Sequence, residues 1–176
     1  YKNLPFCGFA GEQPIRFKEY VDEIIRIYSI FHYFHLEKND KIVILGENSP
    51  NWGKAYLAVT SSGLTAVPVL PDFPSPDIHH IIRHSQAKLV FISKQSLDKL
   101  ENFETGELKG IILLDDLSLI SPETTADFIS SIPVHDNPIA QAKEEDLAAI
   151  IYTSGTTGHS KGVMLSHKNI VSDMVN

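Results

Sequence analysis

Short apolar runs rich in β-branched residues alternate along the chain with longer segments of helical periodicity. Buried strands are expected from the runs at residues 42–45, 66–70, 89–92, 111–114 and 147–152. Apolar residues recur at helical spacing between residues 17 and 34, and again at Ile78, Ile81 and Ile82. This alternation predicts an α/β fold, with a largely parallel sheet flanked by helices.

Prolines refine several of these elements. Ser49 followed by Pro50 is typical of an N-cap with proline at the first helical position, so a helix is predicted over about residues 52–62. Ser75-Pro76-Asp77 repeats that pattern. Pro68 has no N–H, which places the strand at 66–70 at an edge or an end of the predicted sheet. Residues 121–138 are polar and are expected to form a loop with a short helix.

Charge and cysteine usage exclude several classes of function. The 176 residues carry 15 Lys and Arg against 22 Asp and Glu, a net charge of −7, which disfavours a nucleic-acid partner. Cys7 is the only cysteine, so neither an internal disulfide nor a thiolate metal cluster is expected. The sequence shows no signal peptide, polybasic anchor or bilayer-spanning apolar run, and it predicts a cytoplasmic protein while leaving peripheral membrane contact open. Both ends look cut, which suggests a piece of a longer protein.

A glycine-rich, hydroxyl-rich loop lies between the apolar runs at 147–152 and 162–165. Its glycines, Gly155, Gly158 and Gly162, allow backbone N–H groups to approach a ligand closely and to form a concave anion site. The hydroxyl donors are Thr153, Ser154, Thr156, Thr157 and Ser160. Lys161 adds a positive charge, and each charge-assisted hydrogen bond contributes roughly 1.5–3 kcal/mol. The loop is therefore predicted to bind a polyphosphate.

Three other interpretations of this loop compete with that prediction. A solvated polar loop is the plainest, but it does not explain why so many donors stand between two apolar strands. A Walker A loop requires the order Gly-Lys-Ser/Thr, whereas here Lys161 follows Ser160 and precedes Gly162. Residues 158–162 match G-x-S-x-G, but a nucleophile elbow turns from a strand directly into a helix, and here another strand pattern follows.

The segment from Tyr152 to His167 resembles the phosphate-binding signature of the AMP-forming, adenylate-forming superfamily. Ser160 departs from it, because that family usually has proline there. Residues 15–20 and 63–69 resemble two further motifs of the family, and residues 67–71 with 82–91 look most like long-chain fatty acid CoA ligases. The resemblance covers nearly the whole chain and implies that residues 1–176 are the N-terminal, incomplete part of an acetyl-CoA synthetase-like AMP-binding domain.

The resemblance implies a two-step reaction. A fatty acid carboxylate attacks the α-phosphate of Mg²⁺-ATP to give an acyl-adenylate and pyrophosphate, and the thiol of coenzyme A then displaces AMP. The residues expected to hold the β- and γ-phosphates are Thr153, Ser154, Gly155, Thr156, Thr157, Gly158 and Lys161. Thr153 is also expected to help position magnesium. No catalytic residue is assigned within the chain, and residues 1–176 alone are expected to be inactive.

Two alternatives remain open at the level of function. The acid could be short-chain, aromatic or an amino acid, or the chain could be a non-catalytic nucleotide-binding module. Among the histidines, His80 and His84 have a spacing that can bind a metal, but a solvated helix face is the expected role because no third ligand is evident. His32 and His35 are expected to be packed, hydrogen-bonded histidines or contacts at the helix end. His167, at the start of the last helix, could contact substrate or solvent.

Overall fold

The computed structural model describes residues 2–153 and 161–175. Within them a seven-stranded sheet has the order β7-β6-β5-β3-β4-β8-β9, and a separate two-stranded sheet pairs β1 with β2. Strands β3, β4, β5, β6 and β8 run parallel, whereas the edge strands β7 and β9 are antiparallel to their neighbours. The strands are β1 (Pro5–Cys7), β2 (Ile15–Arg16), β3 (Lys41–Leu45), β4 (Thr65–Val69), β5 (Leu89–Ile92), β6 (Gly110–Leu113), β7 (Leu119–Ser121), β8 (Leu147–Thr153) and β9 (Lys161–Ser166).

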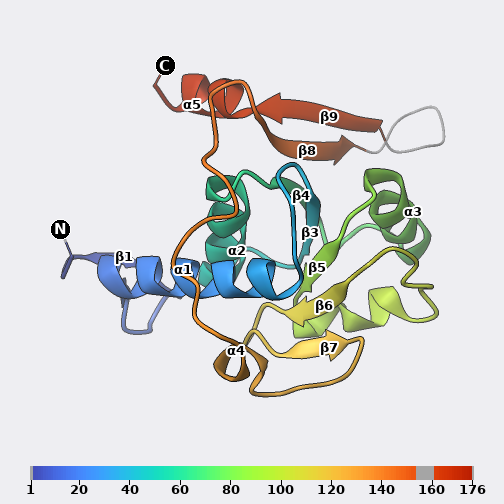
Figure 1. Cartoon of the computed structure of the whole chain (residues 1–176), viewed down its shortest axis with the longest axis horizontal. Coiled ribbons are helices and arrows are strands. Elements are labelled where there is room, and N and C mark those ends of the chain that lie inside the picture. Colours follow the sequence, from blue (N-terminus) through green and yellow to red (C-terminus); the bar gives the residue numbers. More distant parts are fainter. Residues whose placement is uncertain (1, 154–160, 176) are drawn as a thin grey trace.

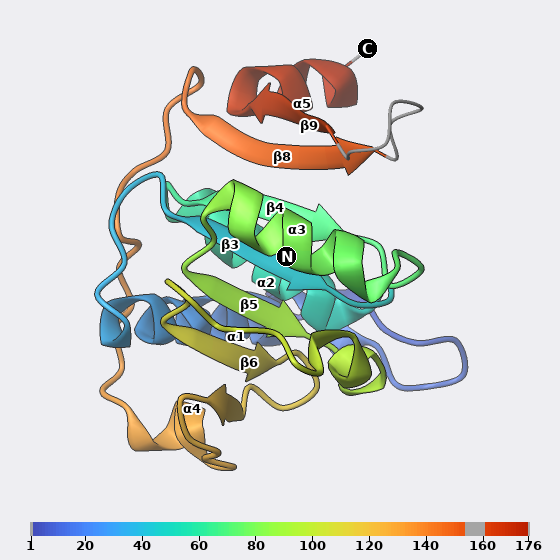
Figure 2. The same ribbon diagram turned by 90° about the vertical axis from the view of Figure 1, so that its right-hand side faces the viewer.

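Helices cover both faces of the large sheet (Figures 1 and 2). They are α1 (Phe17–Tyr33), α2 (Pro50–Ser61), α3 (Ser75–Ser85), the 3₁₀ helix η1 (Lys94–Leu100), α4 (Phe128–Ser131) and α5 (His167–Val175). Helices α1, α2 and α4 pack on one face, in a core that contains Ile42, Ile44 and Phe91. Helix α3 and leucines of η1 pack on the other face, against Val43, Leu45 and Ile92. Alternate residues of each strand therefore serve opposite layers, and the predicted α/β class is confirmed.

The predicted strands and helices are present, with ends shifted by a residue or two. Ser49 caps α2 as expected, because its Oγ accepts a hydrogen bond from the backbone N–H of Trp52 at 3.1 Å. Ile78, Ile81 and Ile82 form the buried stripe of α3. The short strands β1, β2 and β7 and the helix η1 were not predicted, because two or three residues of strand and one 3₁₀ segment leave little periodicity.

The expected edge position of Pro68 is wrong, because β4 lies between β3 and β8 inside the sheet. The backbone N–H of Thr65 donates to Asp40 on the β3 side. Backbone groups of a parallel strand alternate between its two neighbours, so the position of the N–H that Pro68 lacks faces β8. Strand β4 pairs with β8 only at Ala66 and Ala149. An interior proline is tolerated because that ladder has already ended.

Candidate functional site

The two ends of the predicted phosphate loop are paired to each other. Strands β8 and β9 form an antiparallel hairpin in which Thr153 lies opposite Lys161 and Tyr152 lies opposite Gly162. Both Thr153 and Lys161 are exposed. The intervening site residues Ser154, Gly155, Thr156, Thr157 and Gly158 lie outside the described residues, as does Ser160. The structure therefore shows how the loop is anchored, and its phosphate contacts remain a prediction.

The loop leaves the sheet at the edge where ligands bind in folds of this class. Strand β8 is parallel to β4, β4 to β3, β3 to β5 and β5 to β6, so Thr153 lies at the same edge as the carboxyl ends of those strands. Crevices beyond the carboxyl ends of parallel strands are the usual ligand sites in open α/β sheets.

The element that follows the loop bears on the two competing motif interpretations. Lys161 is the first residue of β9, which continues as a strand to Ser166 before α5 begins at His167. A nucleophile elbow and a Walker A loop both lead directly into a helix whose N-terminus faces the substrate. A strand occupies that position here, so the element that follows Lys161 matches neither motif, and Ser160 itself lies outside the described residues.

Helix α3 contacts the hairpin, at the end next to the loop, through a histidine. His84 Nδ1 lies 2.7 Å from the hydroxyl of Tyr152, and the His80 ring lies next to that of His84, with centroids 5.4 Å apart. Burial raises the pKa of Tyr152 above its ordinary value, so its phenol is protonated at neutral pH. Sequence reasoning placed His80 and His84 on a solvated face and missed this contact, because 68 residues separate the two partners.

Three other histidines, and Asp146 just before β8, differ in their surroundings. His32 Nε2 lies 2.9 Å from the backbone oxygen of Asn137, while His35 is exposed at a positive φ of 48°. His167 has a buried Nε2 without a hydrogen-bond partner in the described structure. Asp146 pairs with Lys38 at 2.7 Å. Across residues 2–153 and 161–175, no cluster of three His, Cys, Asp or Glu side chains could hold a metal ion.

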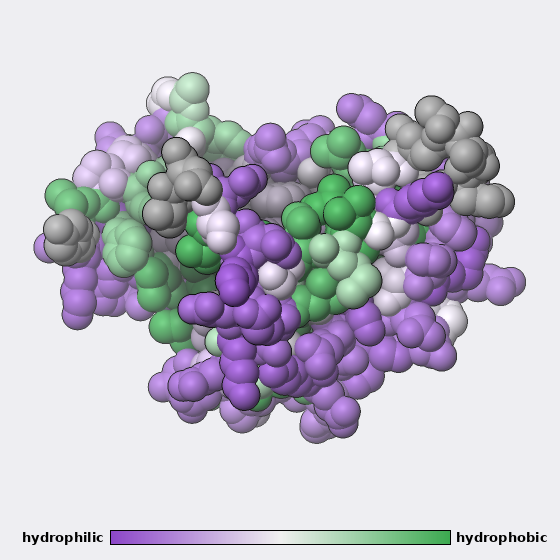
Figure 3. All heavy atoms as spheres, turned by 90° about the horizontal axis from the view of Figure 1, so that it is seen from above, coloured by the Kyte–Doolittle hydropathy of each residue, from purple (hydrophilic) through white to green (hydrophobic). Residues whose placement is uncertain are grey.

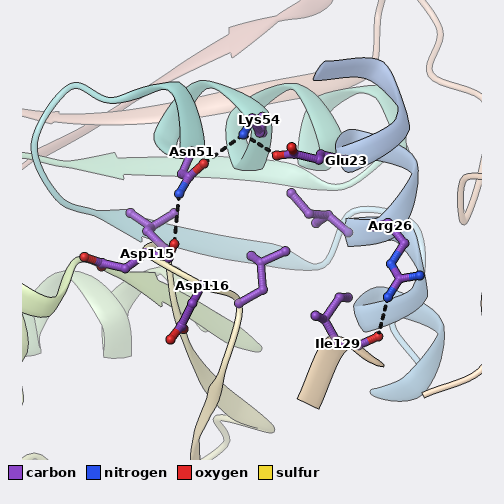
Figure 4. A pocket seen from close by; sticks show the side chains of 10 residues that line it. Glu23, Arg26, Asn51, Lys54, Asp115, Asp116 and Ile129 are labelled. Atoms are coloured by element: carbon purple, nitrogen blue, oxygen red, sulfur yellow. Dashed lines mark hydrogen bonds and ion pairs between the residues drawn. The ribbon is translucent and has the colours of Figure 1, made fainter. Parts of the chain in front are cut away.

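A pocket of roughly 230 Å³ lies near the carboxyl end of β6, between α1, α2 and α4 (Figure 4). Its ionic centre is Lys54, which is 4% exposed and pairs with Glu23 and with Asn51 Oδ1. The Arg26 guanidinium donates to the backbone oxygen of Ile129, and the Asn51 amide to that of Asp115. These polar groups satisfy one another and tie the helices to the end of β6, so the network has a structural role.

An apolar surface surrounds β9 and α5. Met164 is 67% exposed, and Val163 and Val171 are about half exposed. Figure 3 looks down on the side of the molecule that carries these elements and shows apolar side chains gathered there. Strand β9 is also an edge strand of the sheet. None of the described helices is long and apolar enough to cross a membrane.

Two relatives match 79% and 98% of the chain. It is 29% identical over 141 residues to 4-coumarate–CoA ligase 1 of Petroselinum crispum, covering 79% of this chain and 25% of that protein. It is 34% identical over 176 residues to surfactin synthase subunit 1 of Bacillus subtilis (strain 168), covering 98% of this chain and 4% of that protein. The chain thus spans a quarter or less of the length of these two relatives.

Solved structures share the fold. ATP-bound MatB from Rhodopseudomonas palustris superposes with a TM-score of 0.80 at 23% identity, over 99% of this chain and 34% of that one. A fatty acyl CoA synthetase of Mycobacterium tuberculosis gives a TM-score of 0.73 at 20% identity, over 89% of this chain and 30% of that one. The AMP-binding enzyme family matches residues 6–176. This match, the parallel sheet and the hairpin that holds the loop at its carboxyl edge together place the chain in the AMP-binding, adenylate-forming enzyme family.

Proposed function

We propose that this chain supplies the ATP phosphate-binding loop of an acid–CoA ligase that activates a fatty acid. Family membership over residues 6–176 carries the proposal. The anchoring of the loop supports it, because the paired Thr153 and Lys161 fix both ends of the donor-rich segment at the carboxyl edge of the sheet. ATP, as the magnesium complex, a fatty acid and coenzyme A are the proposed substrates.

The proposed roles follow from charge. Backbone N–H groups and hydroxyls of residues 153–158, with the Lys161 ammonium, would neutralise and orient the β- and γ-phosphates. A carboxylate oxygen bonds to the α-phosphorus while the bond to the bridging α–β oxygen breaks, and pyrophosphate leaves. The coenzyme A thiolate then bonds to the acyl carbon, and AMP leaves with the electron pair of the broken C–O bond. The exposed hydroxyl of Thr153 offers the kind of oxygen ligand that Mg²⁺ prefers.

The proposal of a fatty acid as the substrate rests on fewer observations than the proposal of the enzyme class. A fatty acyl CoA synthetase is among the solved structures of this fold, and residues 67–71 with 82–91 resemble long-chain fatty acid ligases. The coumarate ligase is a specific observation in favour of a second candidate, an aromatic acid. Short-chain acids and amino acids complete the set to be tested.

Acid-dependent exchange of labelled pyrophosphate into ATP, measured on the full-length protein, tests this function. Palmitate, octanoate, acetate, 4-coumarate and a mixture of amino acids would be supplied separately, and acyl-CoA would then be measured after coenzyme A is added. Exchange that is fastest with palmitate, followed by palmitoyl-CoA formation, supports the proposal. If exchange occurs only with coumarate, acetate or amino acids, that acid becomes the proposed substrate in place of a fatty acid. The ligase class then still requires that the corresponding thioester forms once coenzyme A is added.

Two outcomes would reject the enzyme class. ATP binding without exchange would indicate a non-catalytic nucleotide-binding module. Ester hydrolysis that needs no ATP and is lost in Ser160→Ala would restore the nucleophile interpretation. The 176-residue chain by itself is proposed to give no thioester, and robust turnover by it would show that these residues hold a complete site.

A further inference from the structure

Tyr152 joins three elements next to Thr153 and Lys161, the described ends of the predicted phosphate loop. It is the last residue of β8 before Thr153, and its side chain is 6% exposed. Across the hairpin it lies opposite Gly162, which directly follows Lys161. Its hydroxyl lies 2.7 Å from His84 Nδ1 on α3. One side chain therefore contacts both strands that bound the loop and the helix that covers that face of the sheet.

The packing at Gly162 shows how closely the Tyr152 ring covers the opposite strand. A Cβ added to Gly162 would lie 3.3 Å from Tyr152 Cζ and 2.7 Å from Ile150 Cγ2. The ring thus occupies the space above the glycine, an arrangement that aligns the two strands of a hairpin.

His84 is the group that holds the ring from outside the hairpin. Burial raises the pKa of the Tyr152 phenol, so it stays protonated, and its O–H can donate to His84 Nδ1 at 2.7 Å. The two rings meet edge to face, with centroids 5.8 Å apart and an interplanar angle of 88°. Strand β8 is joined to β4 by the Ala66–Ala149 pair and by a hydrogen bond from Thr65 Oγ1 to the Leu147 backbone oxygen, both nearer the start of β8. The contact with His84 therefore ties the hairpin to α3 at the other end of β8, next to Thr153.

We infer that His84 and Tyr152 are positioning residues of the ATP-phosphate loop, with His84 fixing the Tyr152 ring and the ring fixing the two strand ends that hold Thr153 and Lys161. This inference rests on the proposed function for its kinetic consequence. Neither residue contacts the reacting atoms in this account. Both act through the placement of the loop, so their loss weakens ATP binding without affecting the acid.

Two substitutions of His84 separate the tether from general packing. Asparagine places its Oδ1 where the imidazole has Nδ1, so His84→Asn retains an acceptor for the phenol. His84→Leu has similar bulk and no acceptor. The matched control is His79→Leu on the same helix, because His79 Nε2 makes a hydrogen bond of similar length, 2.8 Å, to the Lys99 backbone oxygen.

The kinetic test uses pyrophosphate exchange by the full-length protein. In His84→Leu the KM for ATP should rise about fivefold, the factor expected for one net hydrogen bond, with the KM for the acid unchanged. His84→Asn and His79→Leu should stay near the wild-type value. Tyr152→Phe should match His84→Leu, and the double variant should be no worse than either single one, because both remove the same bond. An unchanged KM for ATP in His84→Leu, or an Asn variant as impaired as the Leu variant, would overturn the inference.

A second measurement keeps the inference independent of the enzyme assay. Backbone hydrogen exchange at residues 150–153 and 161–164 should be faster in His84→Leu than in the wild type, and unchanged in His79→Leu. If the wild type shows no acid-dependent exchange of pyrophosphate, the proposed function is rejected. Hydrogen exchange then remains the test of whether His84 holds the hairpin through Tyr152. Equal protection in the wild type and His84→Leu would then reject it.

Discussion

Gly162→Ala tests the close packing that aligns the phosphate-loop hairpin. The new Cβ would lie 2.7 Å from Ile150 Cγ2, inside the 3.0 Å below which a neighbour must shift, and Ile150 is only 9% exposed. Overpacking of this kind costs about 1–3 kcal/mol. Alanine recovers about 0.5–1 kcal/mol over glycine, because the unfolded chain is less free. The midpoints of the two ranges give a net loss of about 1 kcal/mol in the free energy of unfolding.

Urea denaturation at constant m-value measures this loss. Repeating the measurement in two variants of Ile150 tests whether contact with Cγ2 of that residue causes it. Ile150→Leu has a single γ carbon, so it removes the clashing Cγ2, whereas Ile150→Val retains two γ carbons. Gly162→Ala should therefore be nearly neutral in the Leu background and still costly in the Val background. A variant as stable as the wild type, or an equal cost in both backgrounds, would refute the packing argument.

Three further predictions concern the supporting structure. Ser49→Ala should lower the free energy of unfolding by about 1 kcal/mol, because its hydroxyl caps the start of α2, and a change below about 0.3 kcal/mol in urea denaturation would count against the cap. Lys54→Met should be less destabilising than Glu23→Gln, because the first removes a buried charge and the second leaves it without its counter-ion; the reverse order of thermal midpoints would contradict the pairing. The hydrogen bond from Lys38 lowers the pKa of Asp146 below its ordinary value of 3.8, so its stabilising effect is present above that value and is lost as pH falls through the lower folded-state pKa. Asp146→Asn should therefore flatten the loss of stability between pH 5 and pH 2, and equal slopes in acid titrations would exclude this contribution.

Much of the fold could be predicted from the sequence, because its central strands are continuous apolar runs. Residues 42–45 and 89–92 are buried throughout, and their short length and content of β-branched and aromatic residues are typical of buried strands. Helix α3 could be predicted because its buried residues Ile78, Ile81 and Ile82 recur at helical spacing. Pro68 was misassigned because a proline in the sequence does not indicate whether its N–H position faces a paired strand or an unpaired one.

Part of the candidate site could also be predicted from the sequence, and part could not. The donors of residues 153–161 are contiguous, so composition and resemblance could identify them together. The contact between His84 and Tyr152 depends on how α3 crosses the sheet, and no local pattern reports the distance between residues so far apart in sequence. The pairing of Thr153 with Lys161 likewise required the hairpin register.

The central claim is that the loop ending at Lys161 binds the phosphates of ATP, and Lys161→Ala in the full-length protein tests it most directly. The matched control is Lys88→Ala, since Lys88 directly precedes β5, at the amino end of the parallel strands, and pairs with Glu107 on the surface. Loss of one charge-assisted hydrogen bond, worth roughly 1.5–3 kcal/mol, predicts that kcat/KM for ATP in pyrophosphate exchange falls about 10- to 100-fold. The KM for the acid should stay constant, and Lys88→Ala should behave as the wild type. An unchanged dependence on ATP in Lys161→Ala would contradict the account.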